Sequence, residues 1–169
     1  PTGIELRRWQ EDSIPKILNS IISQLNLNPD SINAFMLHAF PGTGKTLLST
    51  LVAKYLIEEK FIDQVIICVP SKQLRIQMER DGREVGLWLN KKTLETRSFD
   101  GIVCTYSQVG NINRDTGHML NAEILRDICS ERKTMVIADE CHHLSDQKNW
   151  GESFQNAFSN SVARLMTTG

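Results

Sequence analysis

Residues 39–46 read Ala-Phe-Pro-Gly-Thr-Gly-Lys-Thr; they overlap the end of a short apolar run, 33–39, and lead into a helical pattern that begins at Lys45. The segment matches the phosphate-binding motif G-x-x-x-x-G-K-[ST] except at Ala39, which replaces the first glycine. In this motif a glycine-rich turn surrounds a phosphate with backbone N–H groups at the start of a helix. The sequence therefore predicts a strand, a P-loop and a helix in direct succession.

The P-loop motif gives each of its polar positions a part in nucleotide binding. Gly42, Thr43 and Gly44 would present backbone N–H groups to the phosphates. Lys45 would reach the β and γ phosphates, and Thr46 would offer its hydroxyl to Mg²⁺. A chance glycine-rich turn before a helix is the alternative, but the flanking strand and helix favour the functional interpretation.

Helical and β-rich segments alternate along the rest of the chain. Apolar residues at spacings of three and four predict helices over 6–25, 45–59 and 118–130, and Ser71 would cap a further helix. Apolar, β-branched runs predict strands over 33–39, 64–69, 101–106, 134–138 and 163–167. Periodicity does not decide 81–100, which fits a helix end and a short strand. The alternation predicts an α/β fold with a parallel sheet between helices, and such sheets bind ligands at the carboxyl ends of their strands.

A second signal lies at the end of the apolar run 134–138, where Asp139 and Glu140 follow. A carboxylate at the tip of a buried strand, in a sheet that also carries a P-loop, is placed to bind Mg²⁺ beside the phosphates. Asp139 is therefore a predicted metal ligand, and Glu140 would orient or deprotonate the attacking water. Without the P-loop, two adjacent acids would be equally well explained as solvated turn residues. A zinc site at 141–143 is disfavoured because adjacent histidines cannot readily converge on one ion.

Length, composition and charge limit the classes of protein that fit. The 169 residues predict one domain, and 40% hydrophobic with 23% charged residues exclude a disordered tail or a fibre. Nineteen Lys and Arg against 20 Asp and Glu leave a net charge of −1, so polyanion binding would depend on local placement of charge. Cys68, Cys104 and Cys129 lie in or beside apolar runs and predict buried free thiols in a reducing compartment. The absence of a long apolar run or signal peptide predicts a soluble, cytoplasmic protein with no membrane partner.

Taken in order, these motifs resemble those of helicase superfamily 2. Residues 39–46 read as motif I, and Asp139 to His142 read as a DExH form of motif II. Residues 6–10, Leu-Arg-Arg-Trp-Gln, resemble the L-R-x-[YW]-Q opening, in which the glutamine, here Gln10, contacts the adenine. The resemblance covers essentially the whole chain. It implies a RecA-like P-loop NTPase fold, a three-layer sandwich with a mainly parallel sheet, that uses ATP and Mg²⁺ with Lys45 and Glu140 as catalytic residues.

The minor motifs of this superfamily also have counterparts in the chain. Residues 69–77 resemble motif Ia and 103–106 resemble a T-Y element; the nucleic-acid contacts that these imply are Pro70, Ser71, Lys72, Gln73, Gln77, Thr105 and Tyr106. Residues 165–169 resemble motif III, which couples the state of ATP to strand binding and implies this role for Thr167 and Thr168 together with His142. Each of these segments alone could be an ordinary helix or strand surface, and their joint order favours the functional interpretation.

Differences between this chain and the DEAD-box motifs indicate the subfamily. DEAD-box RNA helicases carry P-T-R-E-L-A, D-E-A-D and S-A-T, whereas this chain has Pro-Ser-Lys-Gln-Leu at 70–74, Asp-Glu-Cys-His at 139–142 and Thr-Thr-Gly at 167–169. The closer resemblance is to the type III restriction subunit and UvrB-like branch, which implies DNA rather than RNA as partner. Motors of this superfamily have two RecA-like lobes, and the second supplies an arginine finger. We therefore expect residues 1–169 to be an N-terminal ATP-binding lobe that is nearly inactive without the second lobe of the same parent chain.

Alternatives to a motor stay open. The chain could be a nucleotide-binding regulatory module without translocation, although the intact Lys45, Thr46, Asp139 and Glu140 disfavour a degenerate site. It could also be a lobe of an RNA helicase. A small-molecule P-loop kinase is disfavoured by the motif Ia-like stretch and the D-E-C-H box.

Overall fold

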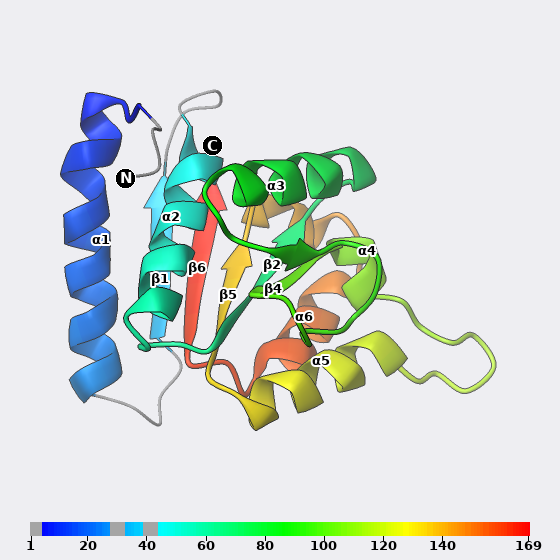
Figure 1. The fold of residues 1–169 in the computed structure, drawn as a ribbon. Coiled ribbons are helices and arrows are strands. Elements are labelled where there is room, and N and C mark those ends of the chain that lie inside the picture. Colours follow the sequence, from blue (N-terminus) through cyan, green and yellow to red (C-terminus); the bar gives the residue numbers. More distant parts are fainter. Residues whose placement is uncertain (1–4, 28–32, 39–43) are drawn as a thin grey trace.

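A computed structural model of the chain describes residues 5–27, 33–38 and 44–169, which form a parallel sheet between two layers of helices (Figure 1). The strands are β1 (Asn33–His38), β2 (Gln64–Val69), β3 (Leu89–Asn90), β4 (Gly101–Thr105), β5 (Thr134–Ala138) and β6 (Ala163–Thr168). They form a six-stranded sheet in the order β1-β6-β5-β2-β4-β3, and every described pairing is parallel. The predicted α/β sandwich with a parallel sheet is therefore confirmed.

Helices cover both faces of this sheet. On one face lie α1 (Arg8–Leu27), α2 (Lys45–Glu58) and α3 (Lys72–Glu84); on the other lie α4 (Tyr106–Val109), α5 (Leu120–Glu131) and α6 (Trp150–Phe158). A short 3₁₀ helix, η1 (Cys141–Ser145), follows β5. In Figure 1, α1 and α2 lie beside β1, and the segment between α4 and α5 extends away from the body. Among the described residues, no helix combines the length and apolar character that a membrane crossing requires.

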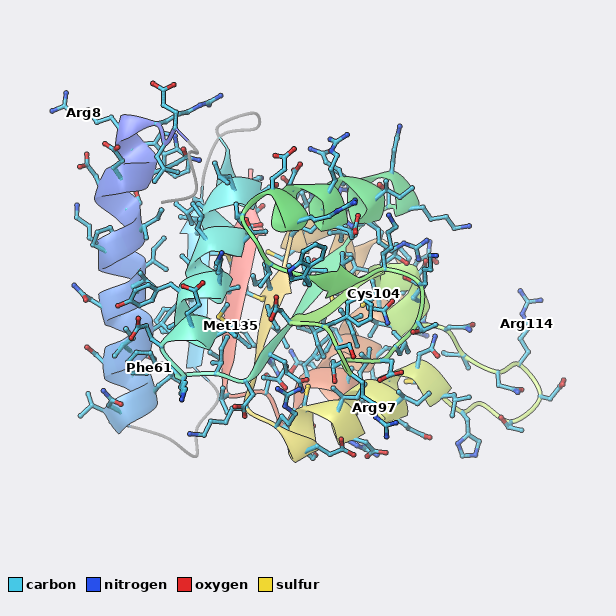
Figure 2. The ribbon with its side chains drawn as sticks, in the orientation of Figure 1. Arg8, Phe61, Arg97, Cys104, Arg114 and Met135 are labelled. Carbon is cyan, nitrogen blue, oxygen red and sulfur yellow. The ribbon has the colours of Figure 1, made fainter. Side chains whose placement is uncertain are left out.

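The alternation of side chains along the central strands divides the core in two. Val65 and Ile67 of β2 pack with α1, α2 and α3, whereas Ile66 and Cys68 pack with α4, α5 and α6. All six residues of β2 are buried, as expected for a strand covered on both faces. Figure 2 shows Met135 and Cys104 within the body, while the Arg114 side chain projects from the extended segment into solvent.

Several elements differ in extent from the prediction. The strand expected over 101–106 ends at Thr105, because the Thr105 hydroxyl accepts a hydrogen bond from the Gln108 backbone and starts a helix there. The helix expected over 118–130 begins at Leu120, and α6 and η1 were not predicted. Cys68, Cys104 and Cys129 are buried free thiols, as predicted.

Candidate active site

Five of the residues predicted to bind or act on the nucleotide line one cleft at the carboxyl edge of the sheet: Gly44, Lys45, Thr46, Asp139 and Glu140. The cleft has a volume of about 410 Å³, and the residues from α2, from the segment after β5 and from α3 that line it include Gly44, Lys45, Thr46, Asp139, Glu140, Gln77 and Asp81. Gly42 and Thr43, also predicted to bind phosphate, lie outside the described residues. The parallel strands bring α2 and the end of β5 together, because both follow strands whose carboxyl ends lie at the same edge.

Gln10 holds the start of α2 in place. Its side chain is 1% exposed; Nε2 donates a hydrogen bond of 2.8 Å to the Gly44 carbonyl, and Oε1 accepts one of 2.8 Å from the Arg7 backbone N–H. Gly44 has a φ of +87°, and a Cβ added there would lie 2.6 Å from Gln10 Nε2, so the left-handed backbone and the close approach both require glycine. The adenine contact expected of Gln10 stays a prediction.

Lys45 and Glu140 form an ion pair across the cleft, although they are 95 positions apart in the chain. The Lys45 side chain is 8% exposed and that of Glu140 is 23% exposed, so the pair is largely shielded from water. Glu140 adopts the left-handed conformation with a φ of +49°, which is uncommon for a non-glycine residue. The structure thus joins the lysine of the P-loop motif to the second acid after β5.

Two hydrogen bonds fix Asp139 at the end of β5. Its backbone N–H donates to the Cys68 carbonyl at 2.9 Å, and its Oδ1 accepts a hydrogen bond of 2.8 Å from the Thr167 hydroxyl of β6. The residue is 6% exposed, and this burial raises the pKa of the Asp139 carboxyl, opposed by the hydrogen bond from Thr167 and by the charge of Lys45. Hydroxyl and carboxylate oxygens are the ligands that Mg²⁺ prefers, so Thr46 and Asp139, which line one cleft, suit that ion.

His142 lies between the acids and the end of β6. Its Nδ1 is 3.0 Å from the Thr168 hydroxyl and 3.6 Å from Glu140 Oε2. Together with the Thr167–Asp139 bond, this connects β6 to both carboxylates of the cleft. The residues predicted to couple the nucleotide to the polymer are therefore contiguous, and the coupling itself stays a prediction.

The residues predicted to contact nucleic acid are divided among three places. Pro70 and Ser71 lie between β2 and α3, where the Ser71 hydroxyl caps the helix by accepting from the Leu74 N–H at 3.2 Å, and Lys72 and Gln73 are exposed beside them. Gln77 instead lines the same cleft as Lys45 and Glu140.

The other two predicted contacts are buried. Thr105 is 3% exposed and caps α4, and Tyr106 is 1% exposed. In this structure their side chains serve packing and hydrogen bonding instead of lying at a surface that a polymer could reach.

The cleft also contains residues that the sequence did not single out. Leu74 and Asp81 of α3 line it on either side of Gln77 at helical spacing, and burial raises the pKa of the Asp81 carboxyl. The available signal was this spacing of positions 74, 77 and 81, which places them along one side of a helix that follows the predicted nucleic-acid loop.

Comparisons with known proteins agree with this geometry. A family model described as "Type III restriction enzyme, res subunit" matches residues 3–168. An uncharacterized protein of Mycobacterium tuberculosis is 30% identical over 169 residues, and one of Mycobacterium leprae is 32% identical; each match covers 97% of this chain and 25% of the relative. The chain thus spans about a quarter of the length of these relatives.

Solved structures show the same fold at low sequence identity. The UvsW helicase from bacteriophage T4 matches with a TM-score of 0.64 and 19% identity, over 98% of this chain and 53% of that one. The Sulfolobus solfataricus SWI2/SNF2 ATPase core, solved in complex with dsDNA, matches with a TM-score of 0.69 and 18% identity, over 98% of this chain and 32% of that one.

Proposed function

The chain belongs to the family of the type III restriction enzyme res subunit and has the fold of the N-terminal lobe of superfamily 2 helicases, and from this premise we propose that it binds and hydrolyses ATP within a nucleic-acid motor. The resemblance inferred from the motifs is confirmed at the level of family and fold. What we propose beyond the family and fold is ATP as the nucleotide, the roles of the residues that act on it and DNA as the polymer.

One observation carries the proposal: Lys45 of the P-loop motif forms a largely shielded ion pair with Glu140, next to Asp139, and all three residues line one cleft. The Thr167–Asp139 hydrogen bond attaches the end of β6 to the same two acids. A buried lysine and two adjacent carboxylates at the end of a parallel sheet are the groups that phosphoryl transfer to water requires: a cation for the phosphates, a ligand for the metal and a carboxylate for the water.

Each of the charged and hydroxyl groups in the cleft would have its own role in hydrolysis. A triphosphate in the cleft would compete with Glu140 for the Lys45 ammonium, because both are anions and Lys45 is largely enclosed. Glu140, released from Lys45, could then accept a hydrogen bond from the attacking water and orient it. Thr46 and Asp139 would hold Mg²⁺, which neutralises charge on the phosphate oxygens when bound.

The polymer would lie along the carboxyl edge of the sheet beyond the cleft. Support comes from exposed Lys72 and Gln73 at the start of α3, directly before Leu74, the first residue of α3 that lines the cleft. Because the chain has a net charge of −1, these contacts would be weak and strongly dependent on salt. We favour duplex DNA over RNA, since the family is that of a restriction enzyme and one structural neighbour was solved in complex with dsDNA.

Full activity would need more than this lobe. The chain spans a quarter of its curated relatives, and a second RecA-like lobe of the same parent protein would supply the arginine finger. In related P-loop enzymes such an arginine is worth roughly 10³ to 10⁵ in rate, so the lobe alone should be nearly inactive. The proposed motor would work in the cytoplasm, where ATP and DNA are both available.

The test of the polymer is the ATPase rate of the full-length protein with duplex DNA, with structured RNA and with neither, at one fixed salt concentration. Stimulation by duplex DNA above that by RNA is the expected result. Stimulation by RNA alone would assign the lobe to an RNA helicase. ATP binding with no stimulation by either polymer would make the chain a nucleotide-binding regulatory module.

A further inference from the structure

Tyr106 reaches the catalytic dipeptide from the opposite side of the sheet. It is the first residue of α4, directly after β4, and it is 1% exposed. Its hydroxyl donates a hydrogen bond of 2.7 Å to the backbone carbonyl of Asp139, 33 positions further along the chain. This carbonyl belongs to the peptide group that joins Asp139 to Glu140.

The orientation of that peptide group determines where both carboxylates point. Beyond it, Glu140 adopts the left-handed conformation with a φ of +49°. The neighbouring backbone is held at both ends, since the Asp139 N–H donates to Cys68 and the Glu140 carbonyl accepts from the His143 N–H at 3.0 Å. The Tyr106 hydroxyl fixes the carbonyl between these two points, where a rotation of the peptide would swing the Glu140 side chain relative to Lys45.

The tyrosine ring is itself held by aromatic packing. Its centroid lies 6.2 Å from that of Trp150 and 6.4 Å from that of Phe154, both in α6. The phenolic hydroxyl carries a proton, and the Asp139 carbonyl can only accept, so the hydroxyl is the donor in this bond. A rigid ring with a protonated hydroxyl is well suited to fix a carbonyl, because the hydrogen bond then costs little further loss of side-chain freedom.

We infer that Tyr106 is a positioning residue for ATP hydrolysis: its hydroxyl holds the Asp139–Glu140 peptide in the orientation that directs both carboxylates into the cleft. This role rests on the proposed function, since it matters only if these carboxylates act on a nucleotide. This role differs from the nucleic-acid contact expected of Tyr106. Because the side chain is buried, Tyr106 would act on hydrolysis only through the Asp139–Glu140 peptide.

The test uses the full-length protein with saturating duplex DNA and compares wild type with Tyr106→Phe, which removes only the hydroxyl. We expect kcat to fall about tenfold, the effect of about 1.4 kcal/mol on a barrier, while KM for ATP changes less than about twofold. The chain has two tyrosines, so Tyr55→Phe is a matched control. Tyr55 is 42% exposed on α2, and its variant should retain the wild-type kcat.

A second variant separates positioning from stability. Leu125→Ala removes a buried side chain of α5 from the same core cluster but is not one of the rings that hold Tyr106, and urea denaturation measures how much each variant is destabilised. At equal loss of stability, Tyr106→Phe should lose kcat and Leu125→Ala should keep it. An equal loss of kcat in both variants would make Tyr106 a packing residue and overturn the inference.

The proposed function can fail separately. Glu140→Gln should abolish hydrolysis whatever Tyr106 does. If Glu140→Gln is inactive and Tyr106→Phe has a kcat within about twofold of wild type, the positioning role is refuted and the site stands. If Glu140→Gln hydrolyses ATP at the wild-type rate, the assignment of the site itself fails.

Discussion

The Lys45–Glu140 ion pair predicts that Glu140→Gln will bind nucleotide more tightly while it loses hydrolysis. In this structure the Lys45 ammonium is engaged by Glu140, and phosphates that take Lys45 must displace that carboxylate. The substitution removes both this competitor and a negative charge from the cleft that would receive an anion. Affinity and turnover should therefore move in opposite directions.

The size of the expected gain in affinity depends on how well water screens the Lys45–Glu140 pair. Exposed ion pairs contribute up to about 1 kcal/mol, and breaking fully buried ones costs about 3 to 5 kcal/mol. Side-chain exposures of 8% and 23% place this pair between the two, and glutamine retains an oxygen that accepts from Lys45. We therefore expect a gain of about 1 to 2 kcal/mol, which is a Kd roughly 5- to 30-fold lower.

Isothermal titration calorimetry with a non-hydrolysable ATP analogue and Mg²⁺ measures this change. Glu58→Gln is the matched control, because Glu58 also pairs with a lysine on α2, Lys54 at 3.5 Å, but is 61% exposed at the far end of the helix. Its Kd should equal that of wild type. An unchanged or weaker affinity in Glu140→Gln would show that Glu140 does not compete with the phosphates for Lys45.

Three further predictions concern stability. Thr167→Val removes the buried hydroxyl that donates to the Asp139 carboxylate, and it should lower the free energy of unfolding, measured by urea denaturation, by about 1.5 to 3 kcal/mol. A loss below about 0.5 kcal/mol would show that this hydrogen bond does not stabilise the fold. A Cβ at Gly101 would lie 1.8 Å from a backbone oxygen of β2, so Gly101→Ala should cost more than about 4 kcal/mol, whereas Gly151→Ala, with nothing within 4 Å, should not destabilise the fold. Burial raises the pKa of Asp81, so its ionised form destabilises the fold at neutral pH but not below the ordinary aspartate pKa of about 3.9. Asp81→Asn should accordingly raise Tm at about pH 7 and leave it unchanged at about pH 3, and exposed Asp127→Asn should change it at neither; a rise that is the same at both values would contradict the assignment.

The sequence predicted the parts of the fold and site that depend on local pattern. The apolar run 134–138 ending in two acids is a local feature, and so is the Gly-Lys-Thr triplet before a helix. Strand order depends on tertiary packing, and it decides that Thr167 of β6 lies beside Asp139 at the end of β5. For the same reason, nothing in the sequence indicated that Lys45 and Glu140 pair directly.

Two other features could have been predicted from the sequence. Thr105 and Gln108 form the T-x-x-Q signature of a capping box, which predicts that the strand ends at Thr105 and that Tyr106 enters a helix. Large apolar residues at 150, 154 and 158 are spaced as on one side of a helix, and the structure places α6 there. The two-residue β3 is too short for any periodicity to be visible.

The burial of Tyr106 has a different cause. Its ring is covered by Trp150 and Phe154, which come from a helix more than 40 positions later in the chain. A Thr-Tyr pair at the end of a strand therefore gives no local indication of whether the tyrosine faces a polymer or the core.

Glu140 is proposed as the carboxylate that orients water at a site built around Lys45, and the other proposed roles depend on this one. The deciding measurement is the steady-state rate of phosphate release by the full-length protein, wild type against Glu140→Gln, with saturating ATP, Mg²⁺ and duplex DNA. We predict a DNA-stimulated rate in the wild type and a loss of at least about 100-fold in the variant, with ATP still bound. Wild-type rates in Glu140→Gln, or a wild-type rate that DNA leaves unchanged, would contradict a DNA-dependent ATPase at this site.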